Sequence, residues 1–437
     1  MSDLALATII FVVTYTVIIT ERIDRTTAAV AGALIMVLAG VINQQQAIAA
    51  IDFNTIGLLI GMMIIVSILK RTGIFAHLGF TVARWTGGRV MPMLLTLALM
   101  TAVASAFLDN VTTVLLMVPV TIALCELLGL PATPFLMTQV IASNIGGTAT
   151  LIGDPPNILI GSATGLDFVS FLVNLGPIVL VILAVAAVAA AFHYRHIART
   201  DIERHAELIA SAATQPIEDP VLLRKSLAVL GITLVGFLLH GMLHLEAATV
   251  ALGGAALLLL ISRVEPHHVF LEIEWSTIFF FAGLFVLVGG IKEMGLLDRL
   301  ATHTIDLTGG NVTFTILALI WLAAALSAVV DNIPAVTTLI PLTFAVARLL
   351  FPDLAGLSNI DLAQHAQVTP LWWALALGAC LGGNATLIGA SANVVAAGVA
   401  ERHGETISFW GFTRVGLPVT LGSLILATGY IWLRYLA

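Results

Sequence analysis

One phrase of small and polar residues occurs twice in this chain of 437 residues, each time in the middle of an apolar stretch. Residues 146–157 and 382–393 share eight identities in twelve positions, where chance in apolar sequence gives roughly one or two. A second pair lies at a different offset, since residues 105–110 repeat as residues 327–332. The chain is therefore a duplication, and the change of offset from 222 to 236 places a 14-residue insertion near residues 351–364.

The apolar content of the sequence indicates what surrounds these repeats. Hydrophobic residues make up 59% of the chain and charged residues 10%, whereas a soluble domain carries about 25% charged residues. The chain is therefore solvated mainly by lipid. Its two cysteines, Cys125 and Cys380, have neither a disulfide framework nor metal-ligand spacing. We expect no cofactor, no resident metal, no enzymatic activity and no nucleic-acid partner.

The apolar stretches divide into complete and interrupted membrane helices. A complete helix needs about 20 apolar residues, and Gly, Pro or polar residues at mid-length mark an interruption. Trp372, Trp373, Trp410 and Trp432 near the ends of these stretches are typical of interfacial anchors. We predict complete spans at 4–20, 26–42, 54–69, 168–193, 226–241, 247–262, 275–291 and 413–433, and interrupted stretches at 91–128, 135–163, 312–349 and 371–398.

The predicted fold is an all-α polytopic membrane protein with two inverted repeats. If 91–128 and 312–349 are re-entrant hairpins, each repeat crosses the membrane five times, so the second repeat is inverted. This arrangement places 14 of the 18 Lys and Arg residues on one side, which is then the cytoplasmic side; complete pairs of spans would give the same sidedness. We expect repeats at 1–193 and 226–437, joined by a cytoplasmic linker at 194–225, in the cell inner (plasma) membrane.

Each predicted hairpin turns at an Asp-Asn pair, Asp109-Asn110 in the first half and Asp331-Asn332 in the second. A carboxylate at the bilayer centre costs several kcal/mol unless it faces water or a protein-lined site. Pro334 suits the first turn of a helix that Asp331 or Asn332 would cap. Capping alone is the alternative role, but two symmetric aspartates favour a functional site.

The two repeated phrases are typical of discontinuous helices. Their glycines free the backbone, and the exposed helix ends offer N–H groups to anions and C=O groups to cations. A phosphate-binding loop is excluded because Gly146-Gly147 lacks a following Gly-Lys-Ser/Thr. Asp154 has Ala390 as its counterpart, which predicts asymmetric coupling to protons or cations. The candidate substrate- and ion-binding residues are Asp109, Asn110, Thr112, Asn144, Gly146, Gly147, Thr148, Thr150, Asp154, Asn157, Asp331, Asn332, Gly382, Gly383, Asn384, Thr386 and Asn393.

The phrases at 107–113, 144–157 and 381–395 resemble the ion transporter superfamily. This superfamily contains arsenite/antimonite efflux permeases of the ArsB group, NhaD-type Na⁺/H⁺ antiporters, the melanosomal P protein and dicarboxylate/citrate carriers. The resemblance covers the chain apart from 194–225 and is strongest to the P protein branch. It implies a scaffold domain, a mobile transport domain that works by alternating access, and a homodimer.

The tips depart from one branch of that superfamily. Its dicarboxylate carriers have Ser-Asn-Thr there, where this chain has Asp109-Asn110-Val111 and Asp331-Asn332-Ile333. At the membrane midplane the repulsion between these carboxylates and a multiply charged anion is poorly screened. Two nearby carboxylates instead share a proton or a cation. Di- and tricarboxylates are therefore disfavoured as substrates.

These considerations predict secondary active transport of a small ion or solute. Arsenous acid is neutral at pH 7 and has three hydroxyls that Asn, Thr and Asp acceptors can match, so H⁺-coupled arsenite/antimonite efflux is the first expectation. Na⁺/H⁺ antiport and transport of citrate, dicarboxylate or another anion are the alternatives, with H⁺ or Na⁺ as coupling ion. Cys380 beside the second break could contact trivalent arsenic, although a buried apolar cysteine is common. An ATPase subunit and a channel-like conductance stay open.

Overall fold

The computed structural model describes residues 3–20, 22–198 and 216–437. Within those ranges the chain is built from helices joined by short loops, and it contains no strand. Residues 199–215 of the predicted linker lie outside the described residues. The first half contains α1 (Asp3–Thr20), α2 (Arg25–Leu38), α3 (Gln44–Ala50), α4 (Phe53–Lys70), α5 (Ile74–Trp85), α6 (Val90–Phe107), α7 (Asn110–Leu128), α8 (Thr133–Gly147), α9 (Pro155–Thr164) and α10 (Phe168–His193).

The second half follows the same order of elements, with one addition. Its helices are α12 (Pro220–Leu243), α13 (Ala247–Ser262), α14 (Pro266–Phe270), α15 (Trp275–Glu293), α16 (Leu296–Thr308), α17 (Val312–Val330), α18 (Asn332–Leu350), α19 (Asn359–Gln364), α20 (Thr369–Gly382), α21 (Ser391–Arg402) and α22 (Phe409–Ile431). The addition is α19, which lies in the predicted insertion. It packs against α9, where the Gln364 side-chain amide donates to the Gly165 carbonyl at 2.9 Å.

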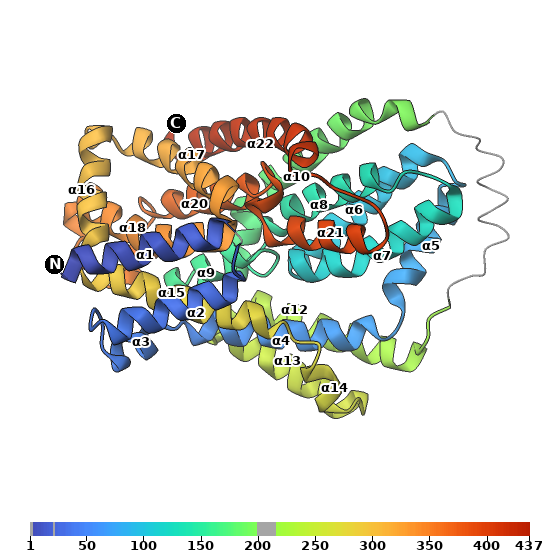
Figure 1. Ribbon diagram of the computed structural model, residues 1–437, viewed down its shortest axis with the longest axis horizontal. Helices are drawn as coiled ribbons and strands as arrows, with labels where there is room; N and C mark the ends of the chain where they lie inside the picture. The colour runs from blue at the N-terminus through green and yellow to red at the C-terminus, as the bar shows by residue number, and fades with distance from the viewer. Residues whose placement is uncertain (1–2, 21, 199–215) are drawn as a thin grey trace.

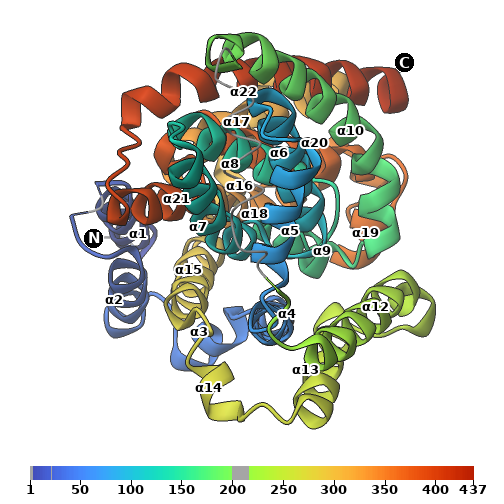
Figure 2. The same ribbon diagram turned by 90° about the vertical axis from the view of Figure 1, so that its right-hand side faces the viewer.

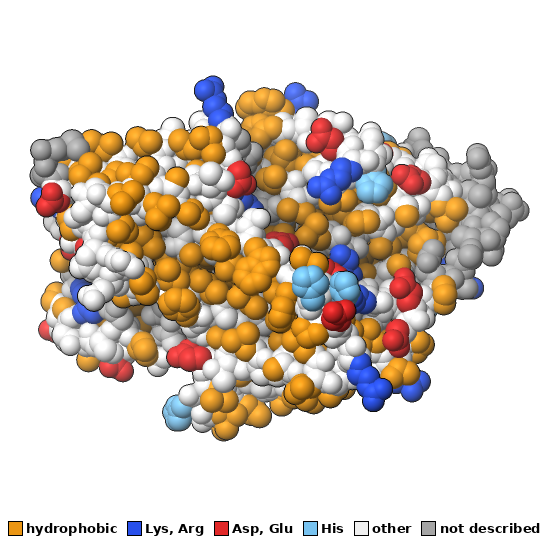
Figure 3. All heavy atoms as spheres, turned by 60° about the horizontal axis from the view of Figure 1, so that its bottom comes forward, with side chains coloured by type: hydrophobic (Ala, Val, Ile, Leu, Met, Phe, Trp, Pro, Cys, Tyr) orange, Lys and Arg blue, Asp and Glu red, His pale blue; other side chains and the backbone are white. Residues whose placement is uncertain are grey.

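Ten of the described helices are long and apolar enough to cross a membrane. The predicted spans 168–193 and 247–262 coincide with α10 and α13. α12 begins at Pro220 rather than at residue 226, because the Asp219 carboxylate caps its first turn by accepting from two backbone N–H groups. Figure 3 shows one face of the molecule, on which apolar side chains cover much of the left and central part, while many charged and His side chains gather in the right-hand half.

Packing partners repeat between the halves. α4 packs against α13 as α15 packs against α2, and α6 packs against α8 as α17 packs against α20. Helices of opposite halves also pack against each other at the centre, where α7 contacts α21 and α18 contacts α9. Every one of these pairs maps onto its counterpart when the halves are exchanged. The duplication seen in the sequence is therefore a pseudo-symmetry of packing.

Apart from α5 and α16, which connect them along the chain, the helices form two groups, which we call the panel and the core bundle. The panel comprises α1–α4 and α12–α15, and the core bundle comprises α6–α10 and α17–α22. Figures 1 and 2 show the panel along one side of the molecule, with α10 and α22 at the far edge of the core bundle. The helical hairpin α6–α7 lies toward one end of the molecule and α17–α18 toward the other, so their tips approach the centre from opposite ends (Figure 1). The inversion of the halves and the number of crossings stay predictions.

The interfacial role predicted for two tryptophans is wrong. Trp372 and Trp373 lie inside the core bundle with 0% and 2% of their surface exposed. α20 has helices packed on several sides, and the ring of Phe171 meets Trp373 edge-on at 5.3 Å between centroids. Trp410 and Trp432 are exposed.

Candidate functional site

Both tip aspartates cap the helix that follows them. The Asp109 carboxylate accepts from the backbone N–H of Thr112 at 2.8 Å, and that of Asp331 accepts from the N–H of Ile333 at 3.2 Å. The cap predicted from Asp331 or Asn332 is formed by Asp331, and Asp109 caps its helix in the same way. In each case the bond uses only Oδ1, and both side chains are buried. Capping therefore leaves the second oxygen of each carboxylate to other partners.

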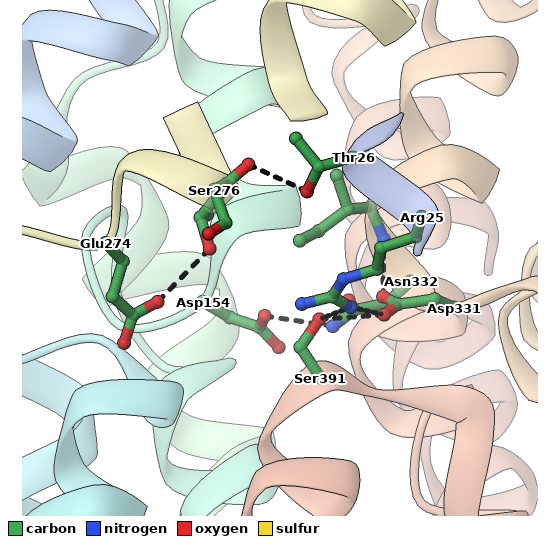
Figure 4. Close-up of polar contacts among 10 residues, drawn as sticks. Arg25, Thr26, Asp154, Glu274, Ser276, Asp331, Asn332 and Ser391 are labelled. Carbon is green, nitrogen blue, oxygen red and sulfur yellow. Dashed lines mark hydrogen bonds and ion pairs between the residues drawn. The ribbon is translucent and has the colours of Figure 1, made fainter. Parts of the chain in front are cut away.

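The two tips meet at a third carboxylate. Asp154 Oδ1 accepts from the amide of Asn110 at 3.2 Å and from the amide of Asn332 at 3.0 Å. Asp154 is fully buried and ends the first helix break, just before α9. Figure 4 shows the Asp154 carboxylate pointing toward the second tip. Both hairpins and the first break thus converge on one side chain that has no acidic counterpart in the second half.

Glycine lets each broken helix approach its hairpin closely. A Cβ atom at Gly146 would lie 2.1 Å from the Ala102 carbonyl oxygen of α6, and one at Gly382 would lie 2.5 Å from Ala324 Cα of α17. Real Cβ contacts are not this short, so any other residue would push the helices apart. The first glycine of each Gly-Gly pair therefore has the same packing role at equivalent points of the two halves.

Asparagine side chains fasten each break. One amide at the start of each second half-helix bridges two carbonyls of the preceding loop, which replaces the hydrogen bonds that the helix loses there. These bonds run from Asn157 to Thr148 and Thr150 at 3.0 and 2.8 Å, and from Asn393 to Gly383 and Thr386 at 2.8 and 2.9 Å.

One further asparagine joins the two breaks to each other. The Asn144 amide donates to Asn384 Oδ1 and Asn393 Oδ1, both at 2.9 Å, while its own Oδ1 accepts from Asn110 at 3.1 Å. These four side chains are buried. They form a continuous polar chain from the first tip across the centre to the second break.

The remaining predicted site residues serve the backbone in this structure. The hydroxyls of Thr150 and Thr386 donate to carbonyls of the neighbouring hairpins, and that of Thr148 donates to the Asn144 carbonyl. Thr112 contributes its N–H to the cap. Gly147 and Gly383 each face the backbone of the glycine at the far end of their own loop. Direct contact of any of these residues with substrate stays a prediction.

Sequence reasoning missed the basic partner of the second tip. Arg25, at the start of α2, donates through Nη1 to Asp331 Oδ2 at 3.0 Å and to Ser391 Oγ at 2.7 Å. Ser391 in turn donates to Asp331 Oδ2 at 2.7 Å (Figure 4). From the sequence alone, Arg25 follows the first predicted span, a position typical of a cytoplasmic anchor. The sequence did hold one sign of this role. The residue that corresponds to Arg25 at an offset of 222 is the uncharged Ala247, so Arg25 departs from the repeat.

A second missed residue is Glu274, which precedes α15 and accepts from the Thr277 hydroxyl at 3.1 Å. Burial raises the pKa of Glu274 from its ordinary value to about 7, and the negative charge of Asp109 adds to the rise. Four carboxyl groups and one guanidinium therefore gather around the tips. Among the residues that the structure describes, no group of three or more His, Cys, Asp or Glu side chains is arranged to hold a metal ion.

Two buried oxygens of this network are unpartnered. Asp154 Oδ2 and Asn110 Oδ1 have no hydrogen-bond partner among the described residues. Such atoms are costly to bury unless a proton, a cation or a solute satisfies them. Cys380 is fully buried nearby, with Sγ 3.5 Å from Asn157 Oδ1. The centre of the molecule therefore offers acceptor oxygens and one thiol.

Comparison with known proteins agrees with this architecture. The family model described as citrate transporter matches residues 15–378. The chain is 42% identical to a 46 kDa membrane protein of Mycobacterium leprae, over 99% of each chain, and 34% identical to the human P protein, over 98% of this chain and 60% of the P protein. An uncharacterized transporter of Mycobacterium tuberculosis is also 42% identical, over 98% of each chain.

A solved structure has the same fold. The YdaH transporter of Alcanivorax borkumensis matches with a TM-score of 0.55 and 16% identity, over 89% of this chain and 87% of that one. The predicted membership of the ion transporter superfamily is confirmed. The chain belongs to the citrate transporter family of that superfamily, and it is a membrane transporter homologous to the P protein.

Proposed function

We propose that the chain is a secondary active transporter of a small neutral or cationic solute, coupled to protons or Na⁺. The observation that carries this proposal is the buried Asp154 carboxylate, on which both hairpin tips converge while Oδ2 stays unpartnered. A carboxylate in this position binds a proton or a cation when the site closes and releases it when the site opens to water.

The charges around the tips disfavour citrate and other carboxylates. Within the described parts of the chain, Arg25 is the basic side chain that bonds to a tip, and its guanidinium already pairs with Asp331. A di- or tricarboxylate would meet Asp109 and Asp154 with no cation to offset the repulsion, which is strong where water is excluded. The match to a family described as citrate transporter therefore supports transport as the activity of the chain, but it does not make citrate the favoured substrate.

Arsenous and antimonous acid are the solutes that fit the polar groups best. Each is neutral near pH 7 and carries three hydroxyls, which can donate to Asn110 Oδ1 and Asp154 Oδ2. The Cys380 thiol beside them offers one soft contact for a trivalent centre. We therefore propose H⁺-coupled arsenite/antimonite efflux as the leading activity.

Na⁺/H⁺ antiport is the second candidate, because the same two atoms suit a small cation. Carboxylate and amide oxygens are ligands for hard cations, and the carbonyls at the ends of broken helices supply more of them. In this activity the cation would replace the proton on Asp154 instead of accompanying a solute.

Transport by the purified chain in proteoliposomes tests both candidates. Arsenite, antimonite, Na⁺, citrate and succinate would each be offered outside vesicles with an acidic lumen and no ATP. We expect arsenite and antimonite to accumulate as protons leave, and Asp154→Asn to abolish this accumulation. Asp353→Asn, a change at an exposed residue of a short 3-10 helix, is the matched control and should transport normally. Accumulation of citrate, or full activity of Asp154→Asn, would refute the proposal.

A further inference from the structure

The core bundle also contains an apolar cavity, which differs in chemistry from the polar centre. A cavity of about 920 Å³ lies between α10 and α22, with α6 and α8 as its floor. Small side chains on α10 create the room, since Ala186, Ala187, Ala189 and Ala190 all line it. The other walls are mainly apolar, with Thr138 of α8 among them and basic residues at one end.

The other half of the molecule shows that this cavity is a local feature. α10 and α22 correspond at an offset of 241, which aligns Pro177 with Pro418 and Ala189 with Tyr430. Tyr430 crosses to α10, where its hydroxyl donates to the Asn174 carbonyl at 2.7 Å. A large aromatic side chain thus bridges the two helices at one end, and alanine leaves the equivalent space open at the other.

The cavity opens toward the membrane. Leu99, Leu180 and Phe192 at its mouth are 52%, 69% and 68% exposed. Figure 2 shows α10 and α22 together at the edge of the molecule opposite to α12 and α13. Apolar side chains on this outer edge face lipid acyl chains, so a hydrocarbon chain can enter the cavity from the bilayer.

One end of the cavity is basic. Its rim is formed by His193, Arg195 and His196 where α10 ends, and by Arg414 where α22 begins. All four side chains are exposed, and none forms an ion pair with an acidic residue in the parts of the chain that the structure describes. The guanidinium of Arg195 lies over the Phe192 ring, 4.4 Å from its centroid. Positive charge is therefore held at the mouth of an apolar groove.

We propose that this groove is a binding site for an anionic phospholipid. An acyl chain would fill the alanine-lined space, and the headgroup phosphate would lie between Arg195 and Arg414. Juxtamembrane Lys and Arg residues attract anionic headgroups in this way. An uncharged lipid would offer these two guanidinium groups no net negative charge, so the site prefers negatively charged lipid.

Native mass spectrometry of the full chain from nanodiscs tests the site, with phosphatidylglycerol and phosphatidylcholine in equal amounts. The wild type should retain phosphatidylglycerol preferentially. R195Q/R414Q should reduce the preference by about fivefold per arginine, from the attraction of one basic residue near a charged surface. A189Y, which copies the residue of the other half, should lower retention of both lipids by filling the groove.

R402Q is the matched control, since Arg402 is an exposed arginine at the end of α21 that does not line the groove. It should behave as the wild type. Equal retention of the two lipids by the wild type, or an unchanged preference in R195Q/R414Q, would overturn the proposal. Because A189Y tests the apolar wall and R195Q/R414Q tests the rim, poor folding of one variant leaves the other decisive.

Discussion

The two hairpin tips share the sequence Asp-Asn and the same helix cap, yet they differ in charge. Asp331 has Arg25 and Ser391 as partners, whereas the corresponding positions for Asp109 are Ala247 and Pro155. No ion pair to Asp109 exists among the described residues. Both halves therefore keep the Asp-Asn pair and its helix cap, while residues at positions that differ between the halves made one tip neutralised and the other acidic.

The backbone of the tips differs as well. Asp109 has φ −66°, an ordinary extended conformation, but Asp331 has φ +87°, which a residue with a side chain adopts rarely. Such strain persists where surrounding contacts over-determine the conformation. At Asp331 those contacts are the guanidinium and the Ser391 hydroxyl. The second tip is therefore held by an ion pair, and we predict that the first tip is the one whose charge changes during transport.

The largest expected effect is the loss of coupled transport at both tips, and the two variants should then differ in stability. Asp109→Asn and Asp331→Asn should both abolish coupled transport, because each removes a carboxylate from the site. Asp109→Asn should leave the thermal midpoint unchanged or raise it, since it removes an unpaired buried charge. Asp331→Asn should lower the midpoint, because it leaves Arg25 without its counter-ion. Transport in proteoliposomes and thermal unfolding in detergent measure the two effects; normal flux in both variants would remove the tips from the mechanism.

The next effect tests the Arg25–Asp331 ion pair by changing its basic member. Arg25→Gln should destabilise the protein by about 2 kcal/mol, below the 3–5 kcal/mol typical of breaking a fully buried pair, because the Arg25 side chain is 31% exposed. Arg25→Gln combined with Asp331→Asn should recover part of the lost stability, since no unpaired charge is left. Arg22→Gln, at a nearby exposed arginine, is the control. An additive loss in the double variant would show that the ion pair does not stabilise the second tip.

A smaller effect concerns Glu274, whose pKa is raised to about 7. The folded protein binds this proton more tightly than the unfolded chain, so stability decreases as pH rises from the ordinary glutamate value through about 7. Glu274→Gln should abolish that decrease and leave stability at low pH unchanged. Thermal midpoints between pH 5 and pH 8 measure it. Parallel pH profiles of wild type and variant would show that Glu274 does not titrate in this range.

Hydropathy and the internal repeat predicted most of the fold. α10 and α13 match their predicted bounds because each is a long apolar run that ends at polar residues, and at α10 the Asp167 carboxylate also caps the first turn. The internal repeat also favoured a meeting of the two tips, because the same element of each half lies at an equivalent place in the packed molecule. Trp372 and Trp373 were misplaced because burial within a helix bundle and burial at a lipid interface select the same aromatic residues.

The site was predicted less completely, for a physical reason. Arg25 and Asp331 are 306 residues apart, and an arginine beside an apolar helix has the same local sequence whether it contacts a headgroup or a carboxylate. Glu274 likewise reads as an ordinary residue before a helix. Local patterns reveal which elements repeat, but the partners that break the symmetry lie on other helices and carry no periodic signal.

The smallest expected effect tests whether the two helix breaks are equivalent. The hydroxyls of Thr150 and Thr386 donate to Ala106 and Ala328, which correspond to each other at an offset of 222. Thr→Val at either position removes one such bond without changing the shape much, so each should cost about 1 kcal/mol. Equal losses in thermal unfolding would mean that the breaks are equivalent scaffolds and that asymmetry is confined to the charged tips. A loss at Thr150 several times larger than at Thr386 would extend the asymmetry to the breaks, because the first break alone supports Asp154.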